Sequence, residues 1–512
     1  MKRKNSLKKR LIVCLAAISG LVILKVCVWD PENNRWLIRD LYYRPPIEAK
    51  LTIAPDLEPI STHKQPLQPA WVLDASKLDA TLVAGIFQPK SVAEIRDLIA
   101  EATRLGQKIS MSGARHTMGG QIAFPNALHL DMRHFDRLRY NDRDRTVTVQ
   151  SGATWKQIQR ELGQHGRAVR VMQDSNIFTV GGSLSSNIHG KDPRFGSLIE
   201  SVVSFKLLNA AGQEVVCSRS QNSELFRSAI GGMGLFGVIT EVTLNTDENA
   251  TYHYTVVHKP LQDMIAFMEA QIQQPDLEMI EAQMAIDQSN FLQEAQIYYF
   301  NKIPTDATLQ DDVMGENNIW LRKLVYRTSR TSDWGKQFRW FMQKQVGPQL
   351  DPQRITRNSA MAAPFRTLEL EDPNTTDVLQ EYFIPTSQVN AFLTEYKRQL
   401  QANKMQLLNV TVRKVKQDDA ALVSYATTDM YAFVSYYKIN KDESGLAQMT
   451  RFTQSLMDYL NTIDAKFYLA YRGYYMRSQI HQMYPNLATL FQLKRQYDPT
   501  EVFSNKWYEA FR

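Results

Sequence analysis

Two clusters of glycine and other small residues restrict the fold of this chain more than any other feature of its sequence. They are SGARHTMGGQ, residues 112–121, and VGGSLSSNIHGKDPRFGSL, residues 180–198. Because glycine has no side chain, backbone N–H groups in such a loop can approach a phosphate closely. Either cluster alone is typical of a plain turn. Together they fit a site where two loops converge on a pyrophosphate.

A third glycine-rich stretch, GGMGLFG, contains Gly232-x-Gly234-x-x-Gly237, which is formally the dinucleotide fingerprint. That fingerprint has meaning only when it follows a strand and opens a helix. Here the order is reversed, because residues 222–230 are predicted to be helical and residues 238–245 to be a strand. We therefore do not expect a Rossmann-type NAD site.

The charge of the chain argues against nucleic acid as a partner. The formal net charge is +7, but six of these charges come from the first ten residues, which leaves +1 for the rest of the 512-residue chain. No basic domain remains to hold a phosphate backbone.

An apolar run, residues 11–29, follows the basic cluster and is long enough to span a membrane. We predict a single-pass anchor, with residues 1–10 cytoplasmic, residues 30–70 as a linker, and the catalytic part extracytoplasmic, hence periplasmic in a bacterium. A cleaved signal peptide and a peripheral helix are the alternatives. The run is longer than an ordinary signal sequence, and no clear cleavage site follows it.

Hydrophobic periodicity predicts an α+β fold. Between residues 71 and 246, helices and strands are intermixed. The clearest elements are a helix over 91–107, strands over 108–113 and 127–132, a hairpin around 142–145 and a helix over 154–166. Beyond residue 247 the strands are longer and rich in aromatic residues. Strand candidates at 379–385, 405–415 and 430–439 predict a second sheet.

The pattern G-x-x-H-[ST], found at residues 113–117, is followed by a glycine and then by the strand ALHLDM. With the block at 180–215 and the stretch SELFRSAIGGMGLFGVITEVTL, it resembles flavoproteins of the vanillyl-alcohol oxidase type, whose FAD-binding domain is named for p-cresol methylhydroxylase (PCMH). The likeness is strongest to cytokinin dehydrogenases, alditol and aldonolactone oxidases and decaprenylphosphoryl-ribose oxidase, and covers most of the chain from Trp71 on.

The resemblance implies a particular division of the chain. Residues 71–246 would form a PCMH-type FAD-binding domain of two subdomains. Residues 247–460 would form a substrate domain with an antiparallel sheet flanked by helices, and residues 461–512 would return to the FAD-binding domain.

The resemblance also implies FAD as cofactor and assigns residues to it. In relatives with this motif the histidine is bonded to the flavin, so His116 is predicted to bind FAD covalently; the alternative is that it only hydrogen-bonds a turn. The side-chain amide of Asn187 is predicted to contact FAD. The full set of predicted FAD-binding residues is Ser112, Gly113, Ala114, Arg115, His116, Thr117, Gly119, Gly181, Gly182, Ser183, Ser186, Asn187, Gly190, Gly196, Val238, Ile239 and Asn505.

The predicted catalytic residues are Glu381, Arg472, Tyr471, Arg413 and His189. By resemblance, His189 and Lys191 would lie near the flavin ring, and Glu381 at the flavin-facing end of a strand, next to candidates Asn409 and Thr411. Tyr471 stands where the ribose oxidase has a lysine, which argues against its ribose-lipid substrate. An acidic residue beside an arginine can bind a sugar hydroxyl and help to remove its proton. A buried ion pair is the structural alternative.

The predicted function is oxidation of a CH–OH group in a sugar-like, polyol or lactone substrate, by hydride transfer to flavin N5. Oxygen, a quinone or a carrier protein would accept the electrons. The alternatives are amine oxidation, as in cytokinin dehydrogenases, and a flavin-binding envelope protein without catalysis. No metal site is expected, and motifs for serine hydrolases, zinc peptidases and P-loop enzymes are absent from the sequence.

Overall fold

The computed structural model describes residues 67–306, 308–313, 319–350, 353–362 and 372–512. All of these residues belong to one compact unit. We call residues 70–248 the first part, residues 251–467 the second part and residues 468–512 the C-terminal segment. The boundaries predicted at residues 246 and 460 stay predictions.

The first part begins with two small sheets. Strands β1 (Ala70–Val72) and β2 (Thr81–Val83) form an antiparallel pair, and a parallel sheet has the order β3 (Gly85–Phe87), β5 (Leu128–Asp131), β4 (Ile109–Ser112). Helix α3 (Val92–Leu105) connects β3 to β4. Its boundaries follow from the sequence: the Ser91 side chain accepts from Glu94 N–H, and Gly106 ends the helix in a left-handed conformation, φ 63°.

A larger antiparallel sheet completes the first part. Its order is β10 (Glu214–Ser218), β9 (Val202–Leu208), β11 (Val238–Glu248), β7 (Thr146–Gln150), β6 (Leu138–Asn141), and β8 (Arg167–Val169) pairs with β11. Helices α4 (Trp155–Gly163), α5 (Val180–Ser186) and α6 (Ser223–Ala229) lie between these strands in the chain. Valines of β7 are buried and its threonines half-buried, because only one face of this strand is on the core. The predicted hairpin is confirmed by the pairing of β6 with β7.

The second part contains an eight-stranded sheet in which every pairing is antiparallel. Its order is β15 (Arg354–Thr356), β12 (Thr251–Pro260), β14 (Glu294–Ile303), β13 (Leu277–Met284), β17 (Gln406–Val415), β18 (Met430–Asn440), β16 (Thr375–Pro385), β19 (Lys466–Phe467). Strands β16 and β18 are buried along most of their length on both faces, so their sequences do not follow a simple alternation of apolar and polar residues.

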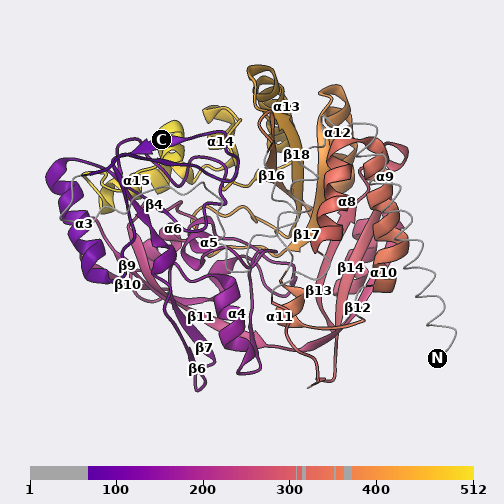
Figure 1. Cartoon of the computed structure of the whole chain (residues 1–512), viewed down its shortest axis with the longest axis horizontal. Coiled ribbons are helices and arrows are strands. Elements are labelled where there is room, and N and C mark those ends of the chain that lie inside the picture. The colour runs from indigo at the N-terminus through magenta and orange to yellow at the C-terminus, as the bar shows by residue number, and fades with distance from the viewer. Residues whose placement is uncertain (1–66, 307, 314–318, 351–352, 363–371) are drawn as a thin grey trace. The chain divides into compact units, whose positions relative to one another are not determined.

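Helices cover this sheet (Figure 1). Helices α12 (Val389–Ala402) and α13 (Glu443–Thr462) pack against each other and against β16 and β18, and α7 (Met264–Ile272) packs against β13 and β14. The other helices of the second part are α8 (Ile319–Thr331), α9 (Asp333–Phe341), a π-helical turn (Met342–Val346), α10 (Gly347–Leu350) and α11 (Arg357–Ala360). The predicted antiparallel sheet flanked by helices is therefore observed.

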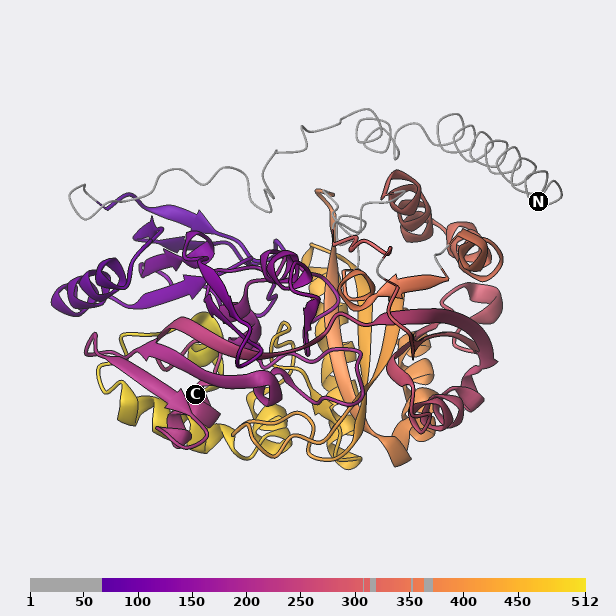
Figure 2. The ribbon, with the colours of Figure 1, turned by 90° about the horizontal axis from the view of Figure 1, so that it is seen from below.

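The C-terminal segment packs against the first part. It contains α14 (Arg477–Met483), α15 (Leu487–Tyr497) and α16 (Lys506–Phe511). Ile109 N–H donates to the Val502 carbonyl at 2.6 Å, and Ser504 N–H donates to the Ile109 carbonyl at 3.0 Å. The segment thus adds a parallel partner to β4, and Figure 2 shows the yellow C-terminal helices beside the indigo-to-magenta first part.

The stretch GGMGLFG connects α6 to β11, so the predicted order of helix before strand is observed. Gly237 has φ 144°, and a Cβ atom there would lie 2.3 Å from the Leu208 carbonyl oxygen. Glycine is required here because the chain passes directly against β9.

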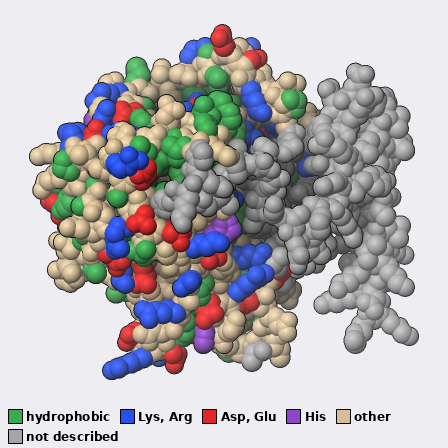
Figure 3. Space-filling view, turned by 60° about the vertical axis from the view of Figure 1, so that its left-hand side comes forward, with side chains coloured by type: hydrophobic (Ala, Val, Ile, Leu, Met, Phe, Trp, Pro, Cys, Tyr) green, Lys and Arg blue, Asp and Glu red, His purple; other side chains and the backbone are tan. Residues whose placement is uncertain are grey.

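Acidic and basic side chains are interspersed on the face shown in Figure 3, in keeping with the near-neutral charge beyond residue 10. Among the described residues, no helix is both long and apolar enough to cross a membrane. The predicted anchor at residues 11–29, the basic segment before it and the linker up to residue 66 lie outside the described residues.

Candidate functional site

A pocket lies between the two glycine clusters and is lined by residues of both. Eight of the predicted FAD-binding residues line it: Ser112, Gly113, Thr117, Gly181, Gly182, Ser186, Val238 and Ile239. Sequence analysis missed the remaining lining residues: Met111, Gln121, Ile122, Met132, Ser151, Thr179, Ser185, Met233, Gly234 and Gly237. Most of these stand within a few positions of a predicted residue, so the quoted motifs already pointed to them.

Glycines allow the walls of this cavity to approach one another. A Cβ atom on Gly113 would lie 1.8 Å from Thr179 Oγ1, just before α5. A Cβ atom on Gly181 would lie 2.7 Å from the Cβ atom of Ser151. The two glycine clusters are therefore packed against each other and against the strand connections beside them.

The lining suits the phosphate and ribityl groups of FAD. Thr117 Oγ1 and Ser151 Oγ are buried at the cavity wall without a hydrogen-bond partner in the protein. Buried hydroxyls of this kind call for a partner. None of the residues that line this cavity is charged, so a bound pyrophosphate would be held by hydroxyls and backbone N–H groups.

Arg115, predicted to contact FAD, has a different role in the structure. It adopts a left-handed conformation, φ 59°, which is uncommon for a residue with a side chain. Its buried guanidinium donates to Ser112 Oγ at 3.2 Å and pairs with Asp131 at 3.3 Å. The side chain of Arg115 therefore supports the loop from inside, and neither it nor Ala114 lines the cavity.

His116 follows this anchored residue and is half-buried, with its ring edge-on to Phe178 at a centroid distance of 4.6 Å. Burial of its imidazole lowers the pKa of His116 to about 4. The imidazole is therefore neutral at physiological pH, which is the form required for a nucleophilic nitrogen.

Asn187 does not match the predicted role of its amide. Its Nδ2 donates to Ser197 Oγ and to Asp418, both at 3.0 Å, and its Oδ1 accepts from Ile199 N–H. The amide is thus fully engaged within the protein. Its left-handed backbone, φ 47°, ends α5 and turns the chain toward His189.

The other predicted FAD-binding residues outside the cavity lining also have partners in the protein. Ser183 Oγ donates to the Thr179 carbonyl, and Asn505 caps α16 and donates to the Met233 carbonyl. Gly119, Gly190 and Gly196 are positions where a Cβ atom would meet Tyr471, Met172 and Glu200 respectively. These residues shape the loops.

His189 and Glu381 meet across the boundary between the first and second parts. His189 Nε2 lies 2.5 Å from Glu381 Oε1, and both side chains are buried. His189 Nδ1 lies 3.1 Å from the Gly190 carbonyl oxygen, which can only accept. If Nδ1 donates there, one further proton lies between Nε2 and the carboxylate. We call this buried pair the His–Glu couple.

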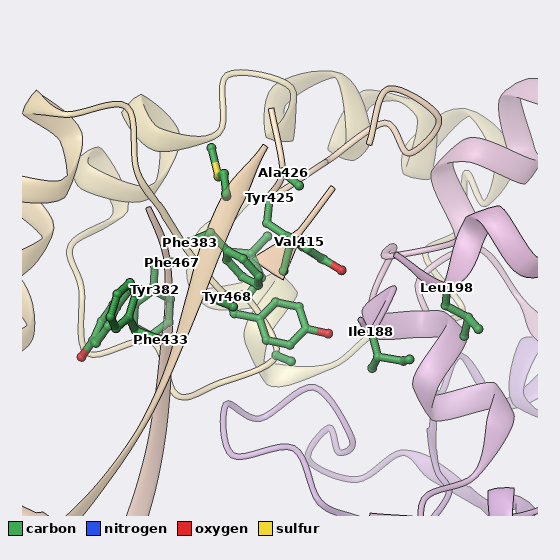
Figure 4. Packing of buried hydrophobic residues seen from close by; sticks show 14 of the residues in the cluster. Ile188, Leu198, Tyr382, Phe383, Val415, Tyr425, Ala426, Phe433, Phe467 and Tyr468 are labelled. Carbon is green, nitrogen blue, oxygen red and sulfur yellow. The ribbon is translucent and has the colours of Figure 1, made fainter. Parts of the chain in front are cut away.

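Aromatic residues surround the His–Glu couple. Phe383 lies edge-on to His189 at 5.4 Å and stacks on Tyr425 at 4.1 Å. Figure 4 shows the hydroxyls of Tyr425 and Tyr468 on the side toward Ile188 and Leu198. They donate to the carbonyls at the end of α5, Tyr425 to Asn187 and Tyr468 to Ser186. These contacts exclude water from the couple and tie α5 to the second part.

Four charged residues form a closed ring of ion pairs beside the couple. Arg413 pairs with Asp174 at 2.6 Å and Glu281 at 3.4 Å, and Lys191 pairs with Glu281 at 3.0 Å and Asp174 at 3.5 Å. Burial alone lowers the pKa of Arg413, but Asp174, Glu281 and Glu381 outweigh it and raise that pKa. Sequence analysis identified Arg413 and Lys191 but missed both acidic members.

Arg472 does not belong to this ring of ion pairs. It pairs with Asp79 at 3.6 Å and stacks over Tyr474. Tyr471, one residue earlier, does lie near the couple: burial chiefly, and Glu381 next, raise the pKa of its hydroxyl. Of the predicted catalytic residues, the structure brings together His189, Glu381, Arg413 and Tyr471. Asn409 lies further along β17, where it accepts from Arg339.

Comparison with known proteins identifies the two halves of this arrangement. A family described as "FAD binding domain" matches residues 83–218, and a family described as "D-arabinono-1,4-lactone oxidase" matches residues 371–511. The first match contains both glycine clusters, and the second contains Glu381, Arg413 and Tyr471. The predicted resemblance to FAD-binding oxidoreductases, and FAD as the cofactor, are confirmed by these two matches.

Curated relatives agree with this assignment. L-gulonolactone oxidase of Mus musculus is 31% identical over 31% of this chain, and D-arabinono-1,4-lactone oxidase of Debaryomyces hansenii is 30% identical over 36% of it. The matched regions span about a third of those relatives' own lengths, 36% and 34%. Cytokinin dehydrogenase 4 of Oryza sativa matches 76% of this chain and 79% of its own length, at 23% identity.

Filling the cavity at Gly182 should reduce FAD binding without unfolding the protein. A Cβ atom there would meet only Thr179 Oγ1, at 3.3 Å, and the glycine has no left-handed backbone. We expect Gly182→Val to weaken FAD binding at least about tenfold, because overpacking a site costs roughly 1–3 kcal/mol. The ratio of flavin to protein absorbance measures the effect, with Gly182→Ala as the smaller step in the same series. Full flavin content in the valine variant, with an unchanged melting temperature, would place the cofactor elsewhere.

Proposed function

We propose that this FAD-dependent oxidoreductase oxidises a CH–OH group of an aldonolactone or a related sugar-like substrate. The observation that carries the proposal is the match of residues 371–511 to the lactone oxidase family, because this region supplies Glu381, the carboxylate of the His–Glu couple. The named activities of the mouse and yeast relatives support the same substrate class.

The chemistry divides between the cofactor and the chain. Oxidation of CH–OH to C=O removes a hydride and a proton, and bound FAD supplies the hydride acceptor. Once the proton between Nε2 and the carboxylate has been released, the His–Glu couple is suited to receive the hydroxyl proton at this buried position. The Arg413 guanidinium and Tyr471 hydroxyl, both near Glu381, are suited to orient the substrate hydroxyl. Oxygen is the proposed electron acceptor, with a quinone or a carrier protein as alternatives.

Amine oxidation is a second candidate. The relative that matches the largest share of this chain among those compared above is a cytokinin dehydrogenase. A neutral hydrogen-bond acceptor at His189 would also take a proton from an amine. A flavin-binding protein without catalysis remains the third outcome for an experiment to distinguish.

Substrate-dependent bleaching of the flavin tests these candidates. We expect D-arabinono-1,4-lactone or L-gulono-1,4-lactone to reduce the flavin anaerobically, and Glu381→Gln to slow this about a hundredfold or more, as for loss of a general base. Glu269→Gln is the matched control, since Glu269 on α7 pairs at 2.8 Å with Lys414 on β17, the strand that also carries Arg413. Bleaching by a cytokinin alone would support amine oxidation. A flavin that no lactone, polyol or amine reduces would exclude catalysis on these substrate classes.

We further propose that His116 is bonded covalently to FAD. Its neutral imidazole and its place in the loop beside the cavity support this. Acid precipitation should then leave the flavin in the protein pellet, whereas His116→Ala should release it and lower its reduction potential. His165→Ala, at a half-exposed helix end, is the control and should keep the pellet yellow. Free FAD from the unaltered protein would contradict covalency, and a yellow pellet from His116→Ala would assign the bond to another residue.

We also propose a single-pass anchor at residues 11–29, with the catalytic part outside the cytoplasmic membrane. The apolar run and the six cations before it support this orientation. Removing residues 1–29 should move the protein from the membrane to the soluble fraction after cell lysis. If the shortened, flavin-containing protein still sediments with membranes, attachment has another cause.

A further inference from the structure

The ring of ion pairs joins the two parts of the protein next to the His–Glu couple. Asp174 and Lys191 belong to the first part, whereas Glu281 on β13 and Arg413 on β17 belong to the second. Each cation contacts both acids, so the ring closes on itself. Two positive and two negative charges give the ring a net charge of zero.

Opposite charges in the ring hold Asp174, Lys191 and Arg413 in their charged forms. Burial alone raises the pKa of Asp174, but Arg413 and Lys191 outweigh it and lower that pKa. Burial alone lowers the pKa of Lys191, but Glu281 and Asp174 outweigh it and raise that pKa. If one member were replaced by a neutral residue, the ring would therefore keep one charge that no opposite charge balances.

The His–Glu couple lies close enough to the ring for such a charge to act on it electrostatically. Lys191 is two residues from His189, and Arg413 interacts with Glu381. Four tyrosines also interact with Glu381, and burial chiefly raises their pKa values well above the usual range, so they stay neutral. They are Tyr425, Tyr468, Tyr471 and Tyr484.

We propose that Asp174 and Glu281 are positioning residues that act through Arg413 and Lys191, and that by keeping the ring neutral they set the pH at which the His–Glu couple releases its proton. The inference rests on the proposed function for its role in turnover. Neither acid contacts the couple in the structure, so each acts through the cations that it neutralises.

The sign of the effect follows from charge alone. Loss of its proton gives the couple one more negative charge. A ring with net charge +1 favours this form and lowers the pH of proton release, whereas a ring with net charge −1 raises it. For charges roughly 8 Å apart in a partly buried site, the interaction corresponds to a shift of about one pH unit.

The test compares single charge removals with a compensated pair. Asp174→Asn and Glu281→Gln should each shift the rising limb of the pH profile for flavin reduction by D-arabinono-1,4-lactone toward acid by about one pH unit. Lys191→Met should shift it toward alkali. The double variant Asp174→Asn/Lys191→Met restores neutrality and should return the limb close to its original position. Asp174 is 39% exposed, so its amide variant requires little repacking.

Two controls separate charge from structure. Asp377→Asn breaks a buried pair with Arg330, 2.8 Å apart, on the strand that carries Glu381, and should lower the melting temperature without moving the profile. The protonation of His189 is measured directly in the flavin-containing protein from ring signals of ¹⁵N-labelled histidine, assigned by their loss in His189→Gln. These signals should move with pH in the same directions as the kinetic limb.

Unchanged profiles, or shifts of the same sign in all three single variants, would overturn the proposal. If no lactone reduces the flavin, the proposed substrate class fails, but the histidine signals still decide whether the ring controls the couple. Opposite shifts for acid and lysine variants, cancelled in the double variant, support the inference in either case.

Discussion

The candidate site depends on the contacts that join residues 189–192, in the first part, to the second part. Three side chains of this short loop each have a charged or hydrogen-bonding partner across the boundary: Glu381 for His189, Glu281 for Lys191 and Arg357 for Asp192. Arg357 is fully buried, so removing any partner would leave a charge without compensation. The loop that follows the cofactor cavity and the strands that carry the proposed substrate contacts are therefore held in one register.

Local signals in the sequence predicted much of the fold. Ser91 and Gly106 mark the ends of α3, because capping and left-handed glycine depend on neighbouring residues only. Strands β16 and β18 were predictable from the aromatic and aliphatic residues that their burial requires, and β17 from the alternation of its valines with polar residues. The cavity was predictable from its glycines, since packing two loops against each other demands small residues at fixed places.

Side-chain partners across the sheet could not be predicted in the same way. Asp174 and Glu281 lie far apart in sequence and meet only because β13 pairs with β17 and the loop docks beside them. Glu278 and Glu281, two acidic residues in the otherwise mostly apolar strand LEMIEAQM, were a signal of buried partners but did not say which ones. Arg413 rather than Arg472 lies near Glu381 for the same reason. The amide of Asn187 was predicted to contact FAD because an asparagine that ends a helix and an asparagine that binds a ligand look alike in sequence.

The pairing of Ile109 with the C-terminal segment also orders events in time. During synthesis β4 is made well before its backbone partners, Val502 and Ser504, which lie several hundred residues later in the chain. At roughly 5–20 residues per second, this edge of the small parallel sheet stays unpaired for about 20–80 s. Contacts between such distant segments also form slowly. The glycine cluster that follows β4 therefore reaches its final position only after residues 502–504 have been made, and the cofactor cavity cannot be completed before then.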